Sequence, residues 1–164
     1  MIFDMNSRSD VPGYGYQLAK GATALTESWA ALPSVSNNHF MLGHIMEWFY
    51  SGLAGIRQQE GAVAFNHSRI YPEPVGDLST VKGSYLSPYG RIATEWKKAG
   101  QAFDLSVVIP ANTKASVYLP ATEKQVITEA GKAINDNPDI KLTGFENGRA
   151  VLQIGSGSYK FKVQ

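Results

Sequence analysis

The chain has 164 residues, of which 43% are hydrophobic, so it is long enough and apolar enough to bury a core of its own. Its 15 Lys and Arg residues nearly balance 14 Asp and Glu residues, and the formal net charge of +1 gives no electrostatic reason to expect a nucleic acid or an anionic membrane as a partner. The absence of cysteine excludes disulfides and thiolate metal sites, and it leaves the compartment open.

The first part of the chain, up to about residue 56, has helical periodicity. Apolar residues recur every three to four positions, on one helix face, at Tyr14, Leu18, Ala22, Leu25 and Trp29. Pro12 suits the start of this helix, and Gly21 leaves its end uncertain. A second helix is expected to begin after the capping residues 36–38 and to stop near Gly55.

The second helix is also the longest apolar stretch of the chain. His44, Glu47 and two glycines interrupt it, which makes it too polar to cross a bilayer. Bulky residues such as Met41 and Trp48 lie on its other faces, so we expect most of its sides to be covered. Two helices are not enough to supply that cover.

From about Gly61 onward, apolar and polar residues alternate, as is typical of half-buried strands. Strands are expected at residues 103–109, 115–119, 140–145, 149–154 and 159–163. Asn147-Gly148 is a strong hairpin signal between two of them. The expected fold class is therefore α+β, with a short helical segment followed by an antiparallel β-sandwich.

Several motifs, in a fixed order, carry a family resemblance. The helical part contains SDVPGYGY at residues 9–16, GATALTESW at 21–29, SNNH at 36–39 and EWFY at 47–50. The β part contains PEPVGD at residues 72–77, VKGSY at 81–85, SPYG at 87–90 and IPANT at 109–113. Together they resemble the end of the catalytic domain and the C-terminal domain of bacterial α-L-rhamnosidases, glycoside hydrolase family 78. The resemblance is good over residues 9–121 and weak beyond.

The resemblance implies a domain plan and an activity. Residues 1–58 would be the last helices of a catalytic (α/α)6 barrel, and residues 59–164 would be the C-terminal β-sandwich domain. Members of this family hydrolyse terminal α-L-rhamnosyl residues with inversion, so the expected ligand is a rhamnose-containing glycan or glycoside, and no cofactor is expected. A bacterial parent enzyme would be periplasmic or secreted if it carries an upstream signal, and otherwise cytoplasmic, because no signal peptide is visible at this N-terminus.

The resemblance implies that Glu27 is the general base, which activates the water that attacks the anomeric carbon. An inverting enzyme needs a second carboxyl group, the general acid, about 6.5–9.5 Å away. The residue pattern alone leaves two alternatives open. In a continuous helix Glu27 points away from the apolar stripe and is a surface residue. If the chain is extended after Gly21, Glu27 lies on the same side as Leu25 and Trp29, where an apolar neighbour suits proton transfer near neutral pH.

Two further residues are expected to bind the sugar. The resemblance places His39 in the sugar-binding pocket, although a histidine in the first turn of a helix often bonds to backbone instead. Trp29 has a flat ring that could stack on a sugar face or belong to the core. His44 and Glu47 share a helix face, but no third ligand has suitable spacing, so no metal site is expected.

The family's general acid has no counterpart in this sequence. The only carboxylates before Glu27 are Asp4 and Asp10, and neither lies in the Asp- and Glu-rich segment that supplies the acid in the family. We therefore expect the chain to be a C-terminal fragment or the product of a truncated gene, inactive by itself. Its helices, exposed without the rest of the barrel, could support self-association.

A different class of function is a non-catalytic carbohydrate-binding or interaction module built on the sandwich. In that case Tyr85, Tyr89 and Trp96 would line a shallow sugar face. Alternation cannot decide whether these three aromatic residues face the solvent or the core.

Overall fold

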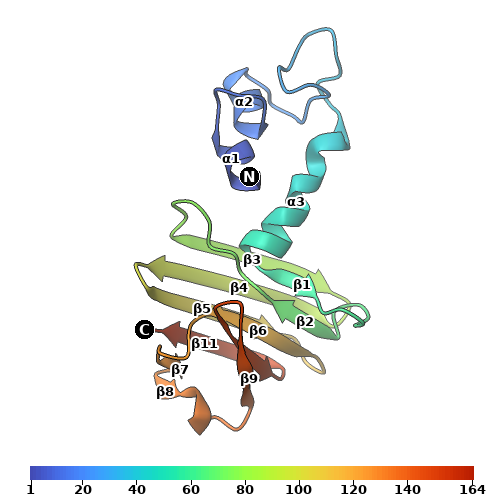
Figure 1. The fold of residues 1–164 in the computed structure, drawn as a ribbon. Helices are drawn as coiled ribbons and strands as arrows, with labels where there is room; N and C mark the ends of the chain where they lie inside the picture. The colour runs from blue at the N-terminus through green and yellow to red at the C-terminus, as the bar shows by residue number, and fades with distance from the viewer. The chain divides into compact units, whose positions relative to one another are not determined.

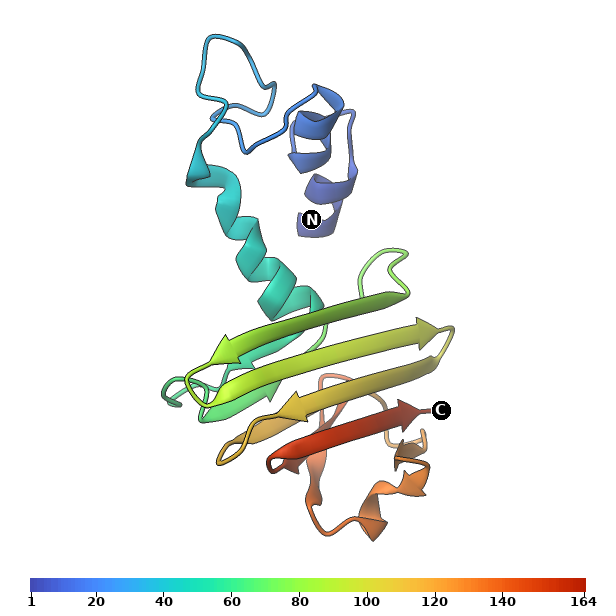
Figure 2. The same cartoon turned by 180° about the vertical axis from the view of Figure 1, so that it is seen from behind.

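The computed structural model describes all residues from Met1 to Gln164. The chain divides into two compact units, Met1–Trp48 and Phe49–Gln164, which are described separately (Figures 1 and 2). The first is helical and irregular, and the second is built of two β-sheets, as the α+β class predicted. None of the helices is long and apolar enough to cross a membrane.

The first unit begins with two short helices, α1 (Ile2–Ser7) and α2 (Tyr14–Ala19). The prediction of a helix from Tyr14 is confirmed only to Ala19. Gly21 has a φ of 84°, and the bonds from Gly21 N to Leu18 O (2.9 Å) and from Ala22 N to Gln17 O (3.0 Å) form a Schellman motif that ends the helix. The remaining apolar positions of the predicted stripe therefore lie outside any helix.

The second predicted helix is confirmed, with mixed geometry. Helical residues run from the 3₁₀ segment η1 (Phe40–His44) through α3 (Ile45–Trp48) to the π-type segment η2 (Phe49–Leu53). The expected cover is missing, since Met41 and Met46 are 54% and 52% exposed.

The second unit is a sandwich of two sheets (Figure 1). The five-stranded sheet has the order β1-β2-β6-β10-β9, with β1 (Ile56–Gln58), β2 (His67–Ile70), β6 (Lys114–Pro120), β10 (Arg149–Ile154) and β9 (Ile140–Glu146). The six-stranded sheet has the order β3-β4-β5-β11-β7-β8, with β3 (Thr80–Ser87), β4 (Gly90–Ala99), β5 (Ala102–Ile109), β11 (Gly157–Val163), β7 (Ile127–Glu129) and β8 (Lys132–Ala133). A short 3₁₀ turn, η3 (Ile134–Asp136), precedes β9.

Strand pairing is antiparallel throughout, as predicted, with one exception. Strands β2 and β6 are parallel, with His67 opposite Lys114. The hairpin expected at Asn147-Gly148 joins β9 and β10, which pair from Arg149 opposite Glu146 onward. The first strand, β1, lies before Gly61, where no strand was predicted. A strand of three residues is too short to show alternation.

The core lies between the two sheets. Alternate side chains along the strands point into it. On β5 the residues Phe103, Leu105, Val107 and Ile109 are at most 3% exposed, and on β11 Phe161 and Val163 are equally buried. Each such side chain contributes roughly 1.5–3 kcal/mol of transfer free energy, so these strands hold the sheets together.

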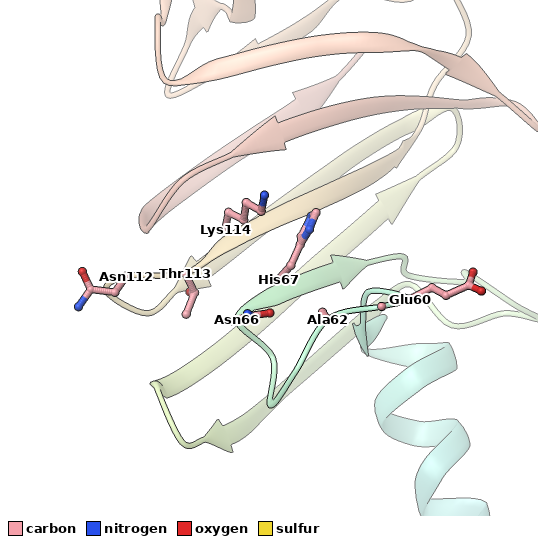
Figure 3. A pocket seen from close by; sticks show the side chains of 8 residues that line it. Glu60, Ala62, Asn66, His67, Asn112, Thr113 and Lys114 are labelled. Atoms are coloured by element: carbon pink, nitrogen blue, oxygen red, sulfur yellow. The ribbon is translucent and has the colours of Figure 1, made fainter.

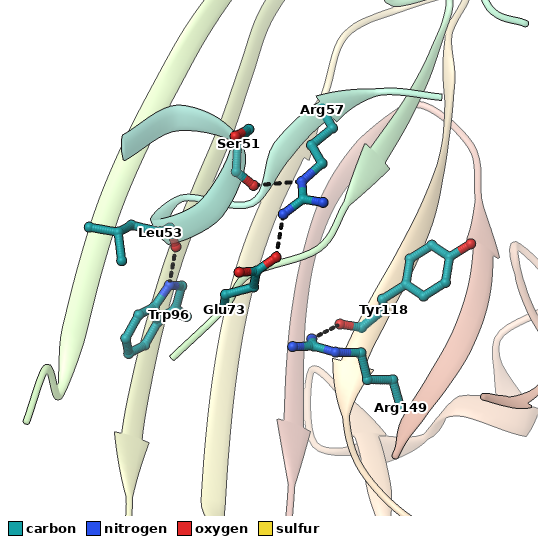
Figure 4. A network of polar contacts seen from close by, with 7 residues as sticks. All are labelled: Ser51, Leu53, Arg57, Glu73, Trp96, Tyr118 and Arg149. Atoms are coloured by element: carbon teal, nitrogen blue, oxygen red, sulfur yellow. Dashed lines mark hydrogen bonds and ion pairs between the residues drawn. The ribbon is translucent and has the colours of Figure 1, made fainter. Parts of the chain in front are cut away.

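The end of the helical run is anchored to β4. The buried Trp96 donates its Nε1 proton to Leu53 O (2.7 Å), as Figure 4 shows, and Thr94 Oγ1 donates to Ala54 O (2.7 Å). Gly55 then turns with a φ of 72°, and a Cβ there would lie 2.2 Å from the backbone nitrogen of Pro72. Only glycine fits at this approach.

Candidate active site

Two irregular segments of the first unit lie side by side and bring the predicted site residues together. The amide of His39 donates to Leu25 O (2.8 Å), and the amide of Glu27 donates to Ser36 O (2.8 Å). Both bonds join residues that have no helix or strand assignment of their own. The backbones of Glu27 and His39 therefore stand on neighbouring stretches of chain.

Glu27 lies on the exposed surface of this paired segment. One carboxylate oxygen, Oε2, accepts a hydrogen bond from the amide of Ser36 (3.2 Å), which orients the group. The other oxygen has no partner within the chain, and Glu27 forms no ion pair. Because α2 ends at Ala19, the continuous-helix alternative for Glu27 is wrong. A carboxylate that is oriented but unneutralised can accept a proton from a bound water.

A buried polar pair supports the segment from beneath. Gln17 and Thr26 are 3% and 1% exposed, and Gln17 Nε2 donates to Thr26 Oγ1 (2.8 Å). The Thr26 hydroxyl in turn donates to Ser28 O. These bonds fix the backbone on both sides of Glu27. Thr26 lies in the GATALTESW motif, but nothing in the sequence marks Thr26 or Gln17 as buried.

His39 caps the helix after it. Its Nδ1 accepts a hydrogen bond from the amide of Met41 (3.2 Å), and its ring stacks on Phe40, with centroids 5.7 Å apart. The backbone-bonded alternative for His39 is therefore realised. It does not exclude a ligand, because a neutral ring that accepts at Nδ1 carries its proton on Nε2 and can donate there.

Trp29 packs edge-to-face against Tyr14, with centroids 5.1 Å apart and ring planes at 86°. The Tyr14 hydroxyl donates to Leu42 O (2.8 Å), and burial raises the pKa of Tyr14. Trp29 remains half-buried, so part of its indole is still accessible. The paired segment thus carries a carboxylate, an imidazole and an indole within one unit.

Comparison with protein families gives two consecutive matches. Residues 1–53 match the bacterial alpha-L-rhamnosidase 6 hairpin glycosidase domain, and residues 55–133 match the bacterial alpha-L-rhamnosidase C-terminal domain. The chain belongs to the bacterial α-L-rhamnosidase family. Both the family resemblance and the order of its two parts are confirmed.

Known α-L-rhamnosidases share the fold of the chain. The crystal structure of the Streptomyces avermitilis enzyme complexed with L-rhamnose has a TM-score of 0.83 and 28% identity, and the comparison covers 96% of this chain and 15% of that one. The enzyme from Dictyoglumus thermophilum has a TM-score of 0.83 and 31% identity, covering 96% of this chain and 18% of that one. An α-L-rhamnosidase of Formosa agariphila is 25% identical over 100% of this chain and 18% of its own length. The chain spans 15–18% of these α-L-rhamnosidases.

The carboxylates that precede Glu27 are both engaged. Asp10 forms a two-point ion pair with Arg8 (2.7 and 2.9 Å), and these hydrogen bonds lower the pKa of Asp10. Asp4 pairs with the Met1 amino group (2.9 Å), which lowers the pKa of Asp4 in the same way. A general acid must hold a proton at neutral pH, so Asp10 is not suited to that role. No group of three His, Cys, Asp or Glu side chains could hold a metal ion.

The alternative of a sugar-binding face on the sandwich is wrong for Trp96, which is fully buried and stacks on Phe103 at 5.8 Å. Tyr85 and Tyr89 are 39% and 43% exposed. Tyr85 packs against Phe65, with centroids 4.7 Å apart, so it is not a free platform. Alternation could not reveal that Trp96 faces inward.

The sandwich does contain a polar cavity of about 540 Å³ (Figure 3). Its lining includes Asn66 and His67, at the start of β2, and Asn112 and Lys114, at the start of β6. His67 Nε2 lies 2.8 Å from the hydroxyl of Ser116, and burial, together with the charge of Lys114, lowers the pKa of His67. None of the predicted site residues lines this cavity.

Proposed function

We propose that the chain is the C-terminal part of an α-L-rhamnosidase that hydrolyses terminal α-L-rhamnosyl residues with inversion. In this proposal residues 1–58 complete the catalytic barrel and residues 59–164 form the C-terminal sandwich domain. The similarity to a Streptomyces avermitilis enzyme crystallised with L-rhamnose supports the substrate class.

One observation carries the assignment of roles. The hydrogen bonds that join Leu25 to His39 and Glu27 to Ser36 place an exposed carboxylate and a half-buried imidazole on neighbouring stretches of chain. Glu27 is proposed as the general base. His39, through Nε2, is proposed to donate to a sugar hydroxyl. Trp29 is proposed to contact the apolar face of the sugar ring.

The proposed reaction involves two proton transfers, and this chain takes part in one of them. The Glu27 carboxylate accepts a proton from a water as the water's oxygen bonds to the anomeric carbon, on the face opposite to the leaving group. A carboxylic acid elsewhere in the parent enzyme protonates the leaving oxygen as its bond to the anomeric carbon breaks. In this proposal the acid lies outside residues 1–164, so this chain alone supplies the base but not the acid.

The test is steady-state kinetics on a parent enzyme that contains this sequence. Glu27→Gln keeps the side-chain shape but removes the base, and kcat should fall by about 10² to 10⁴. His39→Ala should raise KM more than it lowers kcat, through one lost hydrogen bond worth roughly 0.5–1.5 kcal/mol. Azide added to Glu27→Gln should occupy the place of the water and yield a β-rhamnosyl azide.

Glu123→Gln is the matched control, because Glu123 is an exposed carboxylate after β6 in the sandwich, outside the proposed barrel segment, and forms no ion pair. It should leave both kcat and KM unchanged. Near-normal turnover in Glu27→Gln, combined with complete loss in His39→Ala, would mean that Glu27 is a surface residue and that the base role is misassigned.

A further inference from the structure

A cluster of three arginines surrounds one tyrosine on the five-stranded sheet. The guanidinium carbons of Arg57, Arg69 and Arg149 lie 5.2, 4.7 and 4.0 Å from the ring centroid of Tyr71. Arg69 also lies 4.6 Å from the ring centroid of Tyr118. We propose that these three arginines form a binding site for an oxyanion group, namely a carboxylate, sulfate or phosphate.

Strand pairing builds this cluster. Arg57 on β1 is directly opposite Arg69 on β2, and β2 in turn pairs with β6, which carries Tyr118. The inward-facing neighbours Ile56 and Ile70 are buried in the core, so the arginines lie on the outer face of the sheet. Figure 4 shows the side chains of Arg57 and Arg149 on this face, drawn with Tyr118.

The cluster contains more positive charge than its neighbours neutralise. Arg57 pairs with Glu73, the only carboxylate that contacts any of the three guanidinium groups. Arg149 donates instead to the uncharged carbonyl of Tyr118 (3.1 Å), and it forms no ion pair with Glu146, its neighbour in the hairpin register. Like charges opposite each other on a sheet are destabilising, so this arrangement needs compensation.

Arg69 has donor capacity that the chain itself does not use. The Nε of Arg69 is shielded from solvent and forms no hydrogen bond within the chain. Buried donors almost always have a partner, and an unpaired one costs free energy. Burial also lowers the pKa of Arg149, although Tyr71, which hydrogen-bonds to it, and the charge of Glu73 act in the opposite direction, so the Arg149 charge is partly desolvated.

The geometry of the side chains suits an oxyanion. Guanidinium groups stacked on tyrosine rings are held in place through their faces, so their N–H edges remain able to donate. Arg57 uses two of its donors on Ser51 O and Glu73, and Arg149 uses one on Tyr118 O, whereas Arg69 uses none within the chain. Arginine edges bind carboxylate, sulfate and phosphate oxygens in pairs of parallel hydrogen bonds. The ligand could be a free inorganic anion or the acidic substituent of a glycan, and these two sources share the same recognition chemistry.

Binding can be measured by isothermal titration calorimetry on the full chain at constant ionic strength. Calorimetry is preferred to melting because sulfate stabilises many proteins without binding to a site. Sodium sulfate is titrated against a sodium chloride reference, and sodium glucuronate against glucose. We expect saturable binding of sulfate and of glucuronate, and none of chloride or glucose. Tighter binding of glucuronate would identify a glycan acid as the source, and tighter binding of sulfate a free inorganic anion.

Three variants test the assignment. Arg69→Gln should weaken sulfate binding by about tenfold, because one charged donor is lost. Arg91→Gln is the matched control, since Arg91 is an exposed arginine of β4 in the other sheet and should bind sulfate normally. Glu73→Gln keeps all three arginines and removes the competing carboxylate, so it should bind sulfate about threefold more tightly. Far-UV circular dichroism confirms that each variant is folded.

The outcomes separate cleanly. Absence of saturable oxyanion binding would overturn the proposal, as would equal weakening by Arg69→Gln and Arg91→Gln. If Arg69→Gln fails to fold, Glu73→Gln decides the matter, because weaker or unchanged sulfate binding in that variant would also refute the site. Since every residue involved belongs to the sandwich, none of these results depends on whether Glu27 is a catalytic base.

Discussion

Replacing Trp96 by Phe tests how the helical run is fastened to the sandwich. The substitution removes the hydrogen bond to Leu53 O (2.7 Å) and leaves that carbonyl without a donor, at a cost of about 1–3 kcal/mol. The smaller ring leaves a cavity beside Phe103 that costs about 1–2 kcal/mol more. We therefore expect the free energy of unfolding to fall by about 2–5 kcal/mol.

Urea unfolding followed by far-UV circular dichroism measures this difference, because the signal does not depend on the tryptophan itself. Thr94→Val removes a similar bond to Ala54 O with little change in volume, and it should cost about 1–3 kcal/mol. Tyr89→Phe, at an exposed position, serves as a control and should stay within about 0.5 kcal/mol of the wild type. A loss in Trp96→Phe no larger than in that control would refute the reasoning.

Three other predictions concern the chain as it stands. It should release no rhamnose from an aryl rhamnoside above background, because Glu27 lacks an acid partner here, and release in proportion to chain concentration would contradict this. Phe40 is 89% exposed, so the chain should self-associate, as measured by light scattering, and Phe40→Ser should reduce the association. A monomeric chain at every concentration would contradict this prediction. Burial and Lys114 lower the folded-state pKa of His67 below its ordinary value of 6.5, so the native state binds fewer protons than the unfolded state. The stability that His67 contributes should therefore be present above about pH 6.5 and be lost as the pH falls through the folded-state pKa. Urea unfolding at several pH values would detect this loss, and His67→Gln should make the free energy of unfolding less dependent on pH. An identical pH dependence in that variant would exclude His67 as the cause.

The alternation of apolar and polar residues predicted most of the strands of the sandwich, because every second residue of a strand with one buried face lies in the core. Along β5, Phe103, Leu105 and Val107 face the core, and the pattern of apolar and polar residues states this directly. The same pattern could not reveal that β2 pairs in parallel with β6, because nothing in either short strand specifies a partner so far away in sequence. It also could not assign a side to Trp96, since a large aromatic residue fits both a core and a binding face.

In the first unit, the apolar periodicity predicted a longer helix than the structure contains. Tyr14 and Leu18 belong to a helix, but Leu25 and Trp29 continue its spacing only by coincidence, since the Schellman motif at Gly21 ends the helix first. The backbone after this motif is irregular, and its pairing depends on single hydrogen bonds that leave no periodicity to recognise. The roles of Glu27, His39 and Trp29 came from the family resemblance, and they remain predictions.

The parallel pair of β2 and β6 also has a consequence during synthesis. The ribosome adds about 5–20 residues per second, and β6 begins 44 residues after β2 ends, so β2 leaves the exit tunnel roughly 2–9 s before β6 does. In that interval β1 covers one side of β2, and the other side presents unpaired amides and carbonyls to any neighbouring chain. The charged side chain of Arg69 lies in the middle of this strand, where it opposes pairing with a second copy. The same arginine would thus protect the nascent chain before it takes its place beside Tyr71 in the finished sheet.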